Sequence, residues 1–146
     1  MKIRGALPTE RNTLLHIWQR SVRATHTFLT ENDIQSLLPL VRDAALIHLE
    51  LWVLCDDADA PIGFLGLSGP MVEALFIAPE WCRRGGGRML LEHARRLKGA
   101  LAVDVNEQNP EALRFYMACG FEVVGRSDLD ADGRPFPLLH LREVSA

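Results

Sequence analysis

Residues 71–91 limit the possible folds of this chain more than any other segment. Residues 71–77 are rich in aliphatic and aromatic side chains and end before Pro79, which is typical of a strand. A helix is predicted over residues 88–98, where apolar residues recur at helical spacing. The junction between the two is called here the glycine loop, and it consists of Arg83, Arg84, Gly85, Gly86, Gly87 and Arg88.

The glycine loop has the composition of an anion site. Consecutive glycines permit positive φ angles and let another group come close to the backbone. A loop between a strand and a helix directs N–H groups toward the helix N-terminus, where the helix dipole favours negative charge. The three arginines add full positive charge, so the expected ligand is a pyrophosphate. The loop is neither a Walker loop nor the dinucleotide fingerprint, since Leu90 stands where the third glycine belongs.

Bulk composition predicts a single soluble domain over residues 1–146. The chain is 48% apolar and 24% charged, and its net charge of −3 argues against nucleic-acid or membrane partners. We identify no signal peptide and no stretch of transmembrane length. Cys55, Cys82 and Cys119 are odd in number and far apart, which indicates a reducing cytoplasm and not a disulfide framework or zinc site.

The remaining chain reads as strands interrupted by helices. The first helix follows Thr9 as a candidate N-cap, and the second follows a capping box of Thr30 and Asp33 and bends near Pro39. This order predicts an α+β domain with a mixed sheet and helices on both faces. The other predicted strands are residues 2–4, 51–55, 62–68, 101–105, 121–126 and 138–144, and the other predicted helices end near residues 24, 49 and 119.

An aspartate-rich turn precedes the last strand. Asp128, Asp130, Asp132 and Gly133 have the spacing of a calcium loop. The twelfth position is Leu139, where a calcium loop requires a carboxylate. We therefore predict a hairpin turn and no metal site.

Residues 109–121 contain the most specific pattern, Asn-x-x-Ala-x-x-Phe-Tyr-x-x-x-Gly-Phe. With the upstream strand and Gly-x-Gly loop, it resembles the GCN5-related N-acetyltransferase (GNAT) superfamily over nearly the whole chain. The resemblance implies a mostly antiparallel sheet of six to seven strands with helices on both faces. It also implies that two adjacent parallel strands splay apart and admit acetyl-CoA between them.

The resemblance further implies the activity and the cofactor contacts. The expected reaction moves an acetyl group from acetyl-CoA to a primary amine by direct attack, without a covalent enzyme intermediate. The glycine loop would hold the pyrophosphate. The other roles would fall to the backbone of Leu75, Phe76 and Ile77 beside the pantetheine arm, to Asn109 as a donor to that arm, and to Tyr116 as the acid that protonates the thiolate.

Cys82 departs from the family pattern, which has Arg or Gln at this position of the loop. Because the family binds the pyrophosphate mainly through backbone N–H groups, and Arg83 and Arg84 are adjacent, we expect binding to persist with weaker anchoring of the loop. An alternative is a reactive Cys82 thiol, whose pKa neighbouring arginines would lower.

Two carboxylates are candidates for the general base. Glu73 alternates with apolar residues on its strand, and Asp104 precedes Asn109 by five residues, where some relatives in the family carry a catalytic glutamate. For each, the alternative is a solvated strand residue with no catalytic role. His26 and Phe28, in the break between the first two helices, are candidates for acceptor binding, with a purely structural histidine as the alternative.

The acceptor remains open between a small-molecule amine, which we favour, and a peptide amine. A homodimer is possible, as in similar proteins. One rival function is a non-catalytic acyl-CoA sensor that keeps the anion site. Another is a nucleotide-phosphate binder of a different fold.

Overall fold

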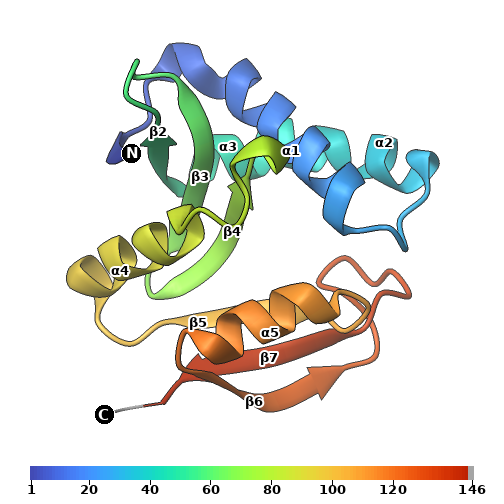
Figure 1. Ribbon diagram of the computed structural model, residues 1–146. Helices are drawn as coiled ribbons and strands as arrows, with labels where there is room; N and C mark the ends of the chain where they lie inside the picture. Colours follow the sequence, from blue (N-terminus) through green and yellow to red (C-terminus); the bar gives the residue numbers. More distant parts are fainter. Residues whose placement is uncertain (145–146) are drawn as a thin grey trace.

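The computed structural model describes residues 1–144 and is built on one seven-stranded sheet with the order β1-β2-β3-β4-β5-β7-β6 (Figure 1). All neighbouring strands are antiparallel except β4 and β5, which are parallel. The predicted α+β class and its mixed, mostly antiparallel sheet are confirmed. The strands are β1 (Lys2–Gly5), β2 (Glu50–Cys55), β3 (Pro61–Ser68), β4 (Met71–Ile77), β5 (Ala102–Asn106), β6 (Phe121–Ser127) and β7 (Leu138–Glu143).

Helices cover both faces of the sheet. Helices α1, α2 and α3 pack on Val53 and Phe64, whereas α4 and α5 pack on Leu54 and Leu65. Successive strand residues point to opposite faces, so adjacent apolar pairs on β2 and β3 supply both cores. No helix in the described part of the chain has the length and apolar character of a membrane span. The helices are α1 (Arg11–Thr25), α2 (Glu31–Leu40), α3 (Leu46–His48), α4 (Gly86–Lys98) and α5 (Pro110–Ala118).

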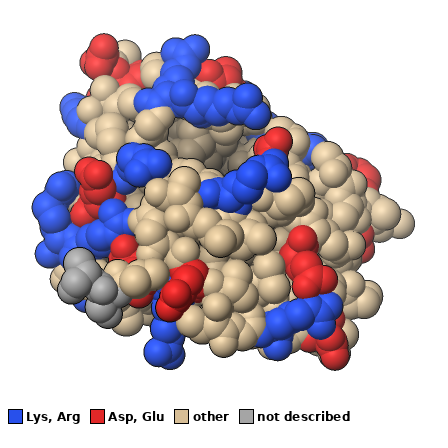
Figure 2. Space-filling model, turned by 60° about the horizontal axis from the view of Figure 1, so that its bottom comes forward, with Lys and Arg blue, Asp and Glu red and all other residues tan. Residues whose placement is uncertain are grey.

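The parallel pair separates almost at once. The described strands β4 and β5 pair only at Met71 with Ala102 and at Val72 with Val103. Figure 1 shows β1–β4 and β5–β7 as two halves of the sheet that diverge from this point. On the face seen in Figure 2, Lys and Arg side chains lie along the rim of a hollow in the surface. The predicted splay is therefore present.

The helix starts confirm one predicted cap and correct two boundaries. The capping box is present: Thr30 N donates to Asp33 Oδ2 at 2.8 Å, and Asp33 N donates to Thr30 Oγ1 at 3.1 Å. Thr9 is not the first cap, because the ion pair of Glu10 with Arg4 and its hydrogen bond to Leu7 N stabilise a preceding 3₁₀ turn. Helix α4 begins at Gly86, two residues earlier than predicted.

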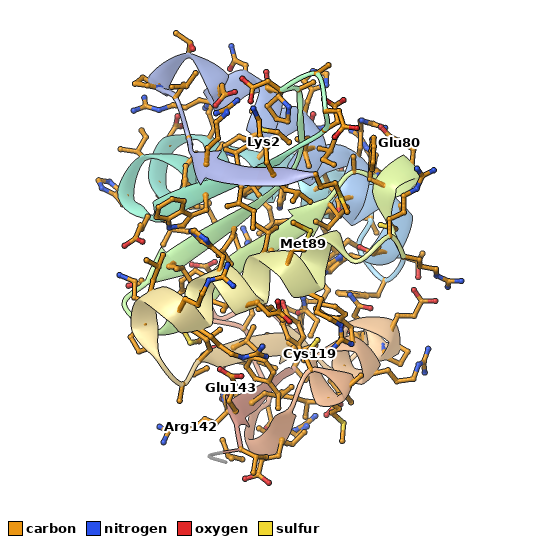
Figure 3. All side chains as sticks on the ribbon, turned by 60° about the vertical axis from the view of Figure 1, so that its left-hand side comes forward. Lys2, Glu80, Met89, Cys119, Arg142 and Glu143 are labelled. Atoms are coloured by element: carbon orange, nitrogen blue, oxygen red, sulfur yellow. The ribbon has the colours of Figure 1, made fainter. Side chains whose placement is uncertain are left out.

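Glu143 on β7 joins helix α4 to the β5–β7 half of the sheet. One of its carboxylate oxygens accepts the Leu101 N–H at 2.8 Å, and the other pairs with Arg95 of α4. Arg95 also donates to the backbone oxygen of Cys119 at 2.8 Å. Cys119 and Glu143 are labelled below α4 in Figure 3. These contacts link α4, which packs against β2, β3 and β4, to the β5–β7 half of the sheet.

The buried side of α4 gives a stability prediction. Leu90 is 0% exposed and belongs to the core cluster on that face. We expect Leu90→Ala to lower the free energy of unfolding by about 2 to 5 kcal/mol in urea denaturation, through lost burial and a residual cavity. The matched control is Leu97→Ala on the same helix, where the side chain is 48% exposed. Equal losses in the two variants would contradict this packing.

Candidate functional site

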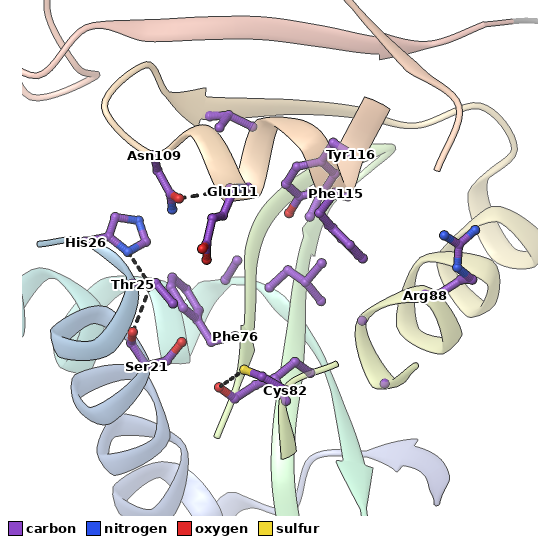
Figure 4. Close-up of a pocket in the computed structure, with 18 of the residues that line it drawn as sticks. Ser21, Thr25, His26, Phe76, Cys82, Arg88, Asn109, Glu111, Phe115 and Tyr116 are labelled. Atoms are coloured by element: carbon purple, nitrogen blue, oxygen red, sulfur yellow. Dashed lines mark hydrogen bonds between the residues drawn. The ribbon is translucent and has the colours of Figure 1, made fainter. Parts of the chain in front are cut away.

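A cleft of about 560 Å³ opens where β4 and β5 separate. Its walls come from the end of α1, from β4, from the glycine loop, from the end of β5 and from the first turns of α5. Figure 4 shows Tyr116 and Asn109 of α5 on one side, His26 on another and Arg88 near the start of α4. Residues far apart in the sequence thus surround one space.

The glycine loop combines one tight turn with two close contacts. Gly85 has a φ of 86° and is the N-cap of α4, and Arg83 has a φ of 63°. Gly86 and Gly87 are helical, and a Cβ there would lie 2.6 Å from a Leu54 methyl and 3.0 Å from the Phe115 ring. Close packing therefore accounts for Gly86 and Gly87, and of the three glycines only Gly85 uses the positive φ expected from the sequence.

The loop fits a diphosphate group. A Cβ added at Gly85 would meet no other atom within 4 Å, so the space above this residue is open. The free N–H groups of the first turn of α4 point toward that end of the cleft, as at any helix start. Arg83 and Arg88 line the cleft and add positive charge.

Two other loop residues hold the loop in place. The Arg84 guanidinium lies 4.9 Å from the centre of the Trp81 ring, as a cation–π contact, and Arg84 does not line the cleft. The Cys82 thiol does line it and approaches the Ala78 oxygen at 3.7 Å. Burial raises the pKa of the Cys82 thiol despite the nearby Arg83. This opposes the alternative of a reactive thiolate.

Helix α5 places two predicted residues in the cleft wall. Asn109 is 6% exposed, and its side-chain oxygen accepts the Ala112 N–H at 3.2 Å as the N-cap of the helix. Its amide NH₂ is the group left for a ligand. Tyr116 is 8% exposed and packs edge-to-face on Phe115 and Phe121. Burial raises the pKa of Tyr116, so its phenol remains protonated at neutral pH.

Glu73 and Asp104 meet at the point of separation. The last paired positions are Val72 and Val103, so these two carboxylates occupy the next position on each strand. Both line the cleft. Partial burial and the neighbouring Asp104 raise the pKa of the Glu73 carboxyl. Two acidic side chains thus stand together in a cleft whose loop end is basic.

The end of α1 supplies a neutral histidine. Thr25 Oγ1 donates to the Ser21 oxygen at 2.8 Å and contacts His26 Nδ1 at 2.8 Å. Since the hydroxyl proton is already used, His26 Nδ1–H must donate to Thr25. Nε2 then carries the lone pair. Burial lowers the pKa of His26 to about 4.

Most of the predicted site residues come together, and Arg84 and Phe28 do not. The Phe28 ring lies behind His26, with its centre 5.5 Å from that ring and 5.8 Å from the Phe136 ring. The sequence prediction did not include Ser21, Thr25 or Glu111, which also line the cleft. Ser21 and Thr25 lie one turn apart at the end of a helix that enters the predicted acceptor region, which is the signal that could have found them.

His26 gives a pH-dependent stability prediction. An unfolded histidine has a pKa of roughly 6.5. The stability that His26 contributes to the fold is therefore fully present above this value. It is lost as the pH falls toward about 4, because only the unfolded chain takes up the proton in that window.

We expect the stability lost between pH 7 and pH 5 in urea unfolding to be smaller by about 1 to 2 kcal/mol in His26→Gln than in wild type. His48→Gln, at an exposed histidine, should keep the wild-type pH dependence. The same pH dependence in His26→Gln and wild type would refute a partly buried, neutral His26.

Comparison with known proteins assigns the family. The family described as "Acetyltransferase (GNAT) domain" matches residues 48–123. The peptidyl-lysine N-acetyltransferase YjaB of Salmonella typhimurium is 45% identical over 141 residues, which is 97% of each chain. The solution structure of apo-form YjaB from Escherichia coli has a TM-score of 0.92 at 45% identity, covering 99% of this chain and 98% of that chain.

A more distant structure shares the fold. The PaiA N-acetyltransferase of Thermoplasma acidophilum, in complex with coenzyme A, has a TM-score of 0.79 at 19% identity. The match covers 99% of this chain and 98% of that chain. The chain therefore belongs to the GNAT family of N-acetyltransferases.

Proposed function

We propose that this chain transfers the acetyl group of acetyl-CoA to the side-chain amine of a lysine in a peptide or protein. The observation that carries the proposal is the separation of β4 from β5 into a cleft that has the glycine loop at one end and Glu73 with Asp104 along it. The relative named a peptidyl-lysine N-acetyltransferase favours lysine over the small molecule preferred from the sequence.

The cofactor half of the cleft suits coenzyme A. The glycine loop holds the diphosphate through N–H groups, Arg83 and Arg88. Beyond Val72, the described edge of β4 faces the cleft and not a paired strand, so Leu75, Phe76 and Ile77 offer backbone groups to the pantetheine arm. Asn109 adds its NH₂. Bound there, acetyl-CoA supplies the activated thioester carbonyl.

Tyr116 is the acid for the leaving thiolate. Its phenol lines the cleft, and burial raises its pKa, so the proton is present when it is needed. The edge-to-face contacts with Phe115 and Phe121 fix the ring. A fixed donor stabilises developing negative charge without reorganising.

The acidic pair serves the acceptor. An unperturbed lysine has a pKa of roughly 10.4, so the amine arrives as a cation. Asp104 binds the ammonium, and Glu73 takes a proton from it, because a raised pKa makes its carboxylate the better proton acceptor. The free amine then attacks the thioester. His26 Nε2 and Thr25 line the acceptor side of the same cleft.

The activity test combines acetyl-CoA with a panel of lysine peptides and small amines. We expect thiol release that depends on a peptide, with acetylated lysine detected by mass. Binding of CoA with no thiol release across the panel would indicate the acyl-CoA sensor. Stabilisation by ATP and not by CoA would indicate a nucleotide-phosphate binder.

Tyr116→Phe tests the acid. We expect kcat to fall by about 100-fold, since only the hydroxyl is removed from a buried ring. The affinity for acetyl-CoA, measured by calorimetry, should change little. Unchanged turnover would remove Tyr116 from this role.

Gly85→Val tests the diphosphate site. A branched side chain at a φ of 86° is strained and fills the open space above the loop. We expect the Kd for CoA to rise by at least about 10-fold, the equivalent of one charge-assisted hydrogen bond. The matched control is Gly69→Val, at a φ of 56° with no atom within 4 Å of its Cβ, in the turn before β4. Retained affinity in Gly85→Val would place the diphosphate elsewhere.

A further inference from the structure

A chain of three polar side chains crosses the sheet behind the acidic pair. Asp104 on β5, His140 on β7 and Ser127 on β6 come from three adjacent strands. His140 Nδ1 lies 2.6 Å from Asp104 Oδ1, and His140 Nε2 lies 2.7 Å from Ser127 Oγ. Neither His140 nor Ser127 was predicted from the sequence as a site residue.

Strand register brings these residues together. Asp104 is directly opposite His140 in the antiparallel β5–β7 ladder, and His140 is opposite Gly125 on β6. The β6 register shifts between Val123 and Gly125. A Cβ added at Gly125 would lie 3.4 Å from His140 Cδ2, so the glycine leaves the ring in close contact with the β6 backbone. The imidazole is confined on one side by a strand and at both nitrogens by polar partners.

The hydrogen-bond pattern defines the donor to Asp104. A carboxylate accepts hydrogen bonds, so His140 Nδ1–H donates to Asp104. The Ser127 hydroxyl, which can donate or accept, is the partner of Nε2. Asp104 Oδ1 is bound by His140, which leaves Oδ2 for the cleft that Asp104 lines.

We propose that His140 is a positioning residue for acetyl transfer: it holds the Asp104 carboxylate so that its second oxygen meets the ammonium of the acceptor, and Ser127 fixes the imidazole. This inference rests on the proposed lysine acetyltransferase function. The groups next to Asp104 are Glu73, at the adjacent position on β4, and His140 behind it. Glu73 keeps its proposed role as the proton acceptor, and His140 acts on binding of the acceptor.

The kinetic test separates KM from kcat. His140→Ala should raise KM for a lysine peptide by at least about 10-fold, as is typical when a residue behind a ligand-binding group is removed. Its kcat should stay within about twofold, because the thioester and the Glu73 carboxylate are untouched. Combining it with Asp104→Asn should add no further loss, because both changes remove the same interaction.

Two conservative variants sharpen the test. His140→Asn places an N–H near the position of Nδ1 and should restore most of the acceptor affinity. His140→Gln reaches toward Ser127 instead and should behave like His140→Ala. The control is His48→Ala, which changes an exposed histidine outside β5, β6 and β7. It should keep the wild-type KM. The proposal would be overturned by an unchanged KM in His140→Ala or by equal rescue with Asn and Gln. It would also be overturned if His140→Ala and Asp104→Asn had additive effects on KM.

Long-range ¹H–¹⁵N NMR of the imidazoles provides a readout without turnover. We expect a proton on Nδ1 of His140 in wild type and a changed ¹⁵N pattern in Asp104→Asn. An Nδ1 without a proton, or a pattern insensitive to Asp104→Asn, would overturn the link. If wild type acetylates none of the peptides, the proposed function is wrong. The NMR result still decides whether His140 positions Asp104.

Discussion

The early separation of two parallel strands determines the rest of this structure. Strands β4 and β5 share two paired positions and then diverge, which leaves a backbone edge and a cleft where a sheet would continue. Such an edge is costly unless a ligand or solvent satisfies its polar groups. Glu143 and Arg95 link α4 to the β5–β7 half, while the glycine loop and α5 form walls of the cleft.

Charge is divided along the cleft. The loop end has helix N–H groups, Arg83 and Arg88, which suit a diphosphate. Glu73 and Asp104 stand side by side where the strands part, which suits a cationic amine. Under the proposed function, these opposite charges would draw an anionic donor and a cationic acceptor into the same space. The buried Tyr116 lies in the wall of that space with its proton retained.

Local patterns in the sequence predicted most of the fold. Helical periodicity, the Thr30–Asp33 capping box and the strand runs depend on neighbouring residues, and they were correct within a few positions. The family pattern then located Asn109 and Tyr116.

Features that depend on contacts across the fold were missed. Gly86 and Gly87 are small because Leu54 and Phe115 lie against them, and no local signal reports those neighbours. His140 was missed for the same reason, because strand register alone places it behind Asp104. Arg84 and Phe28 were predicted to contact ligands; in the structure Arg84 packs on the Trp81 ring and Phe28 on the Phe136 ring.

A crystal structure with acetyl-CoA bound tests the central claim most directly. We predict the diphosphate at the N–H groups of residues 85–88, the pantetheine arm along β4 between the separated strands, and the sulfur beside the Tyr116 hydroxyl. Density for the cofactor outside the β4–β5 cleft, or a sulfur remote from Tyr116, would contradict this account.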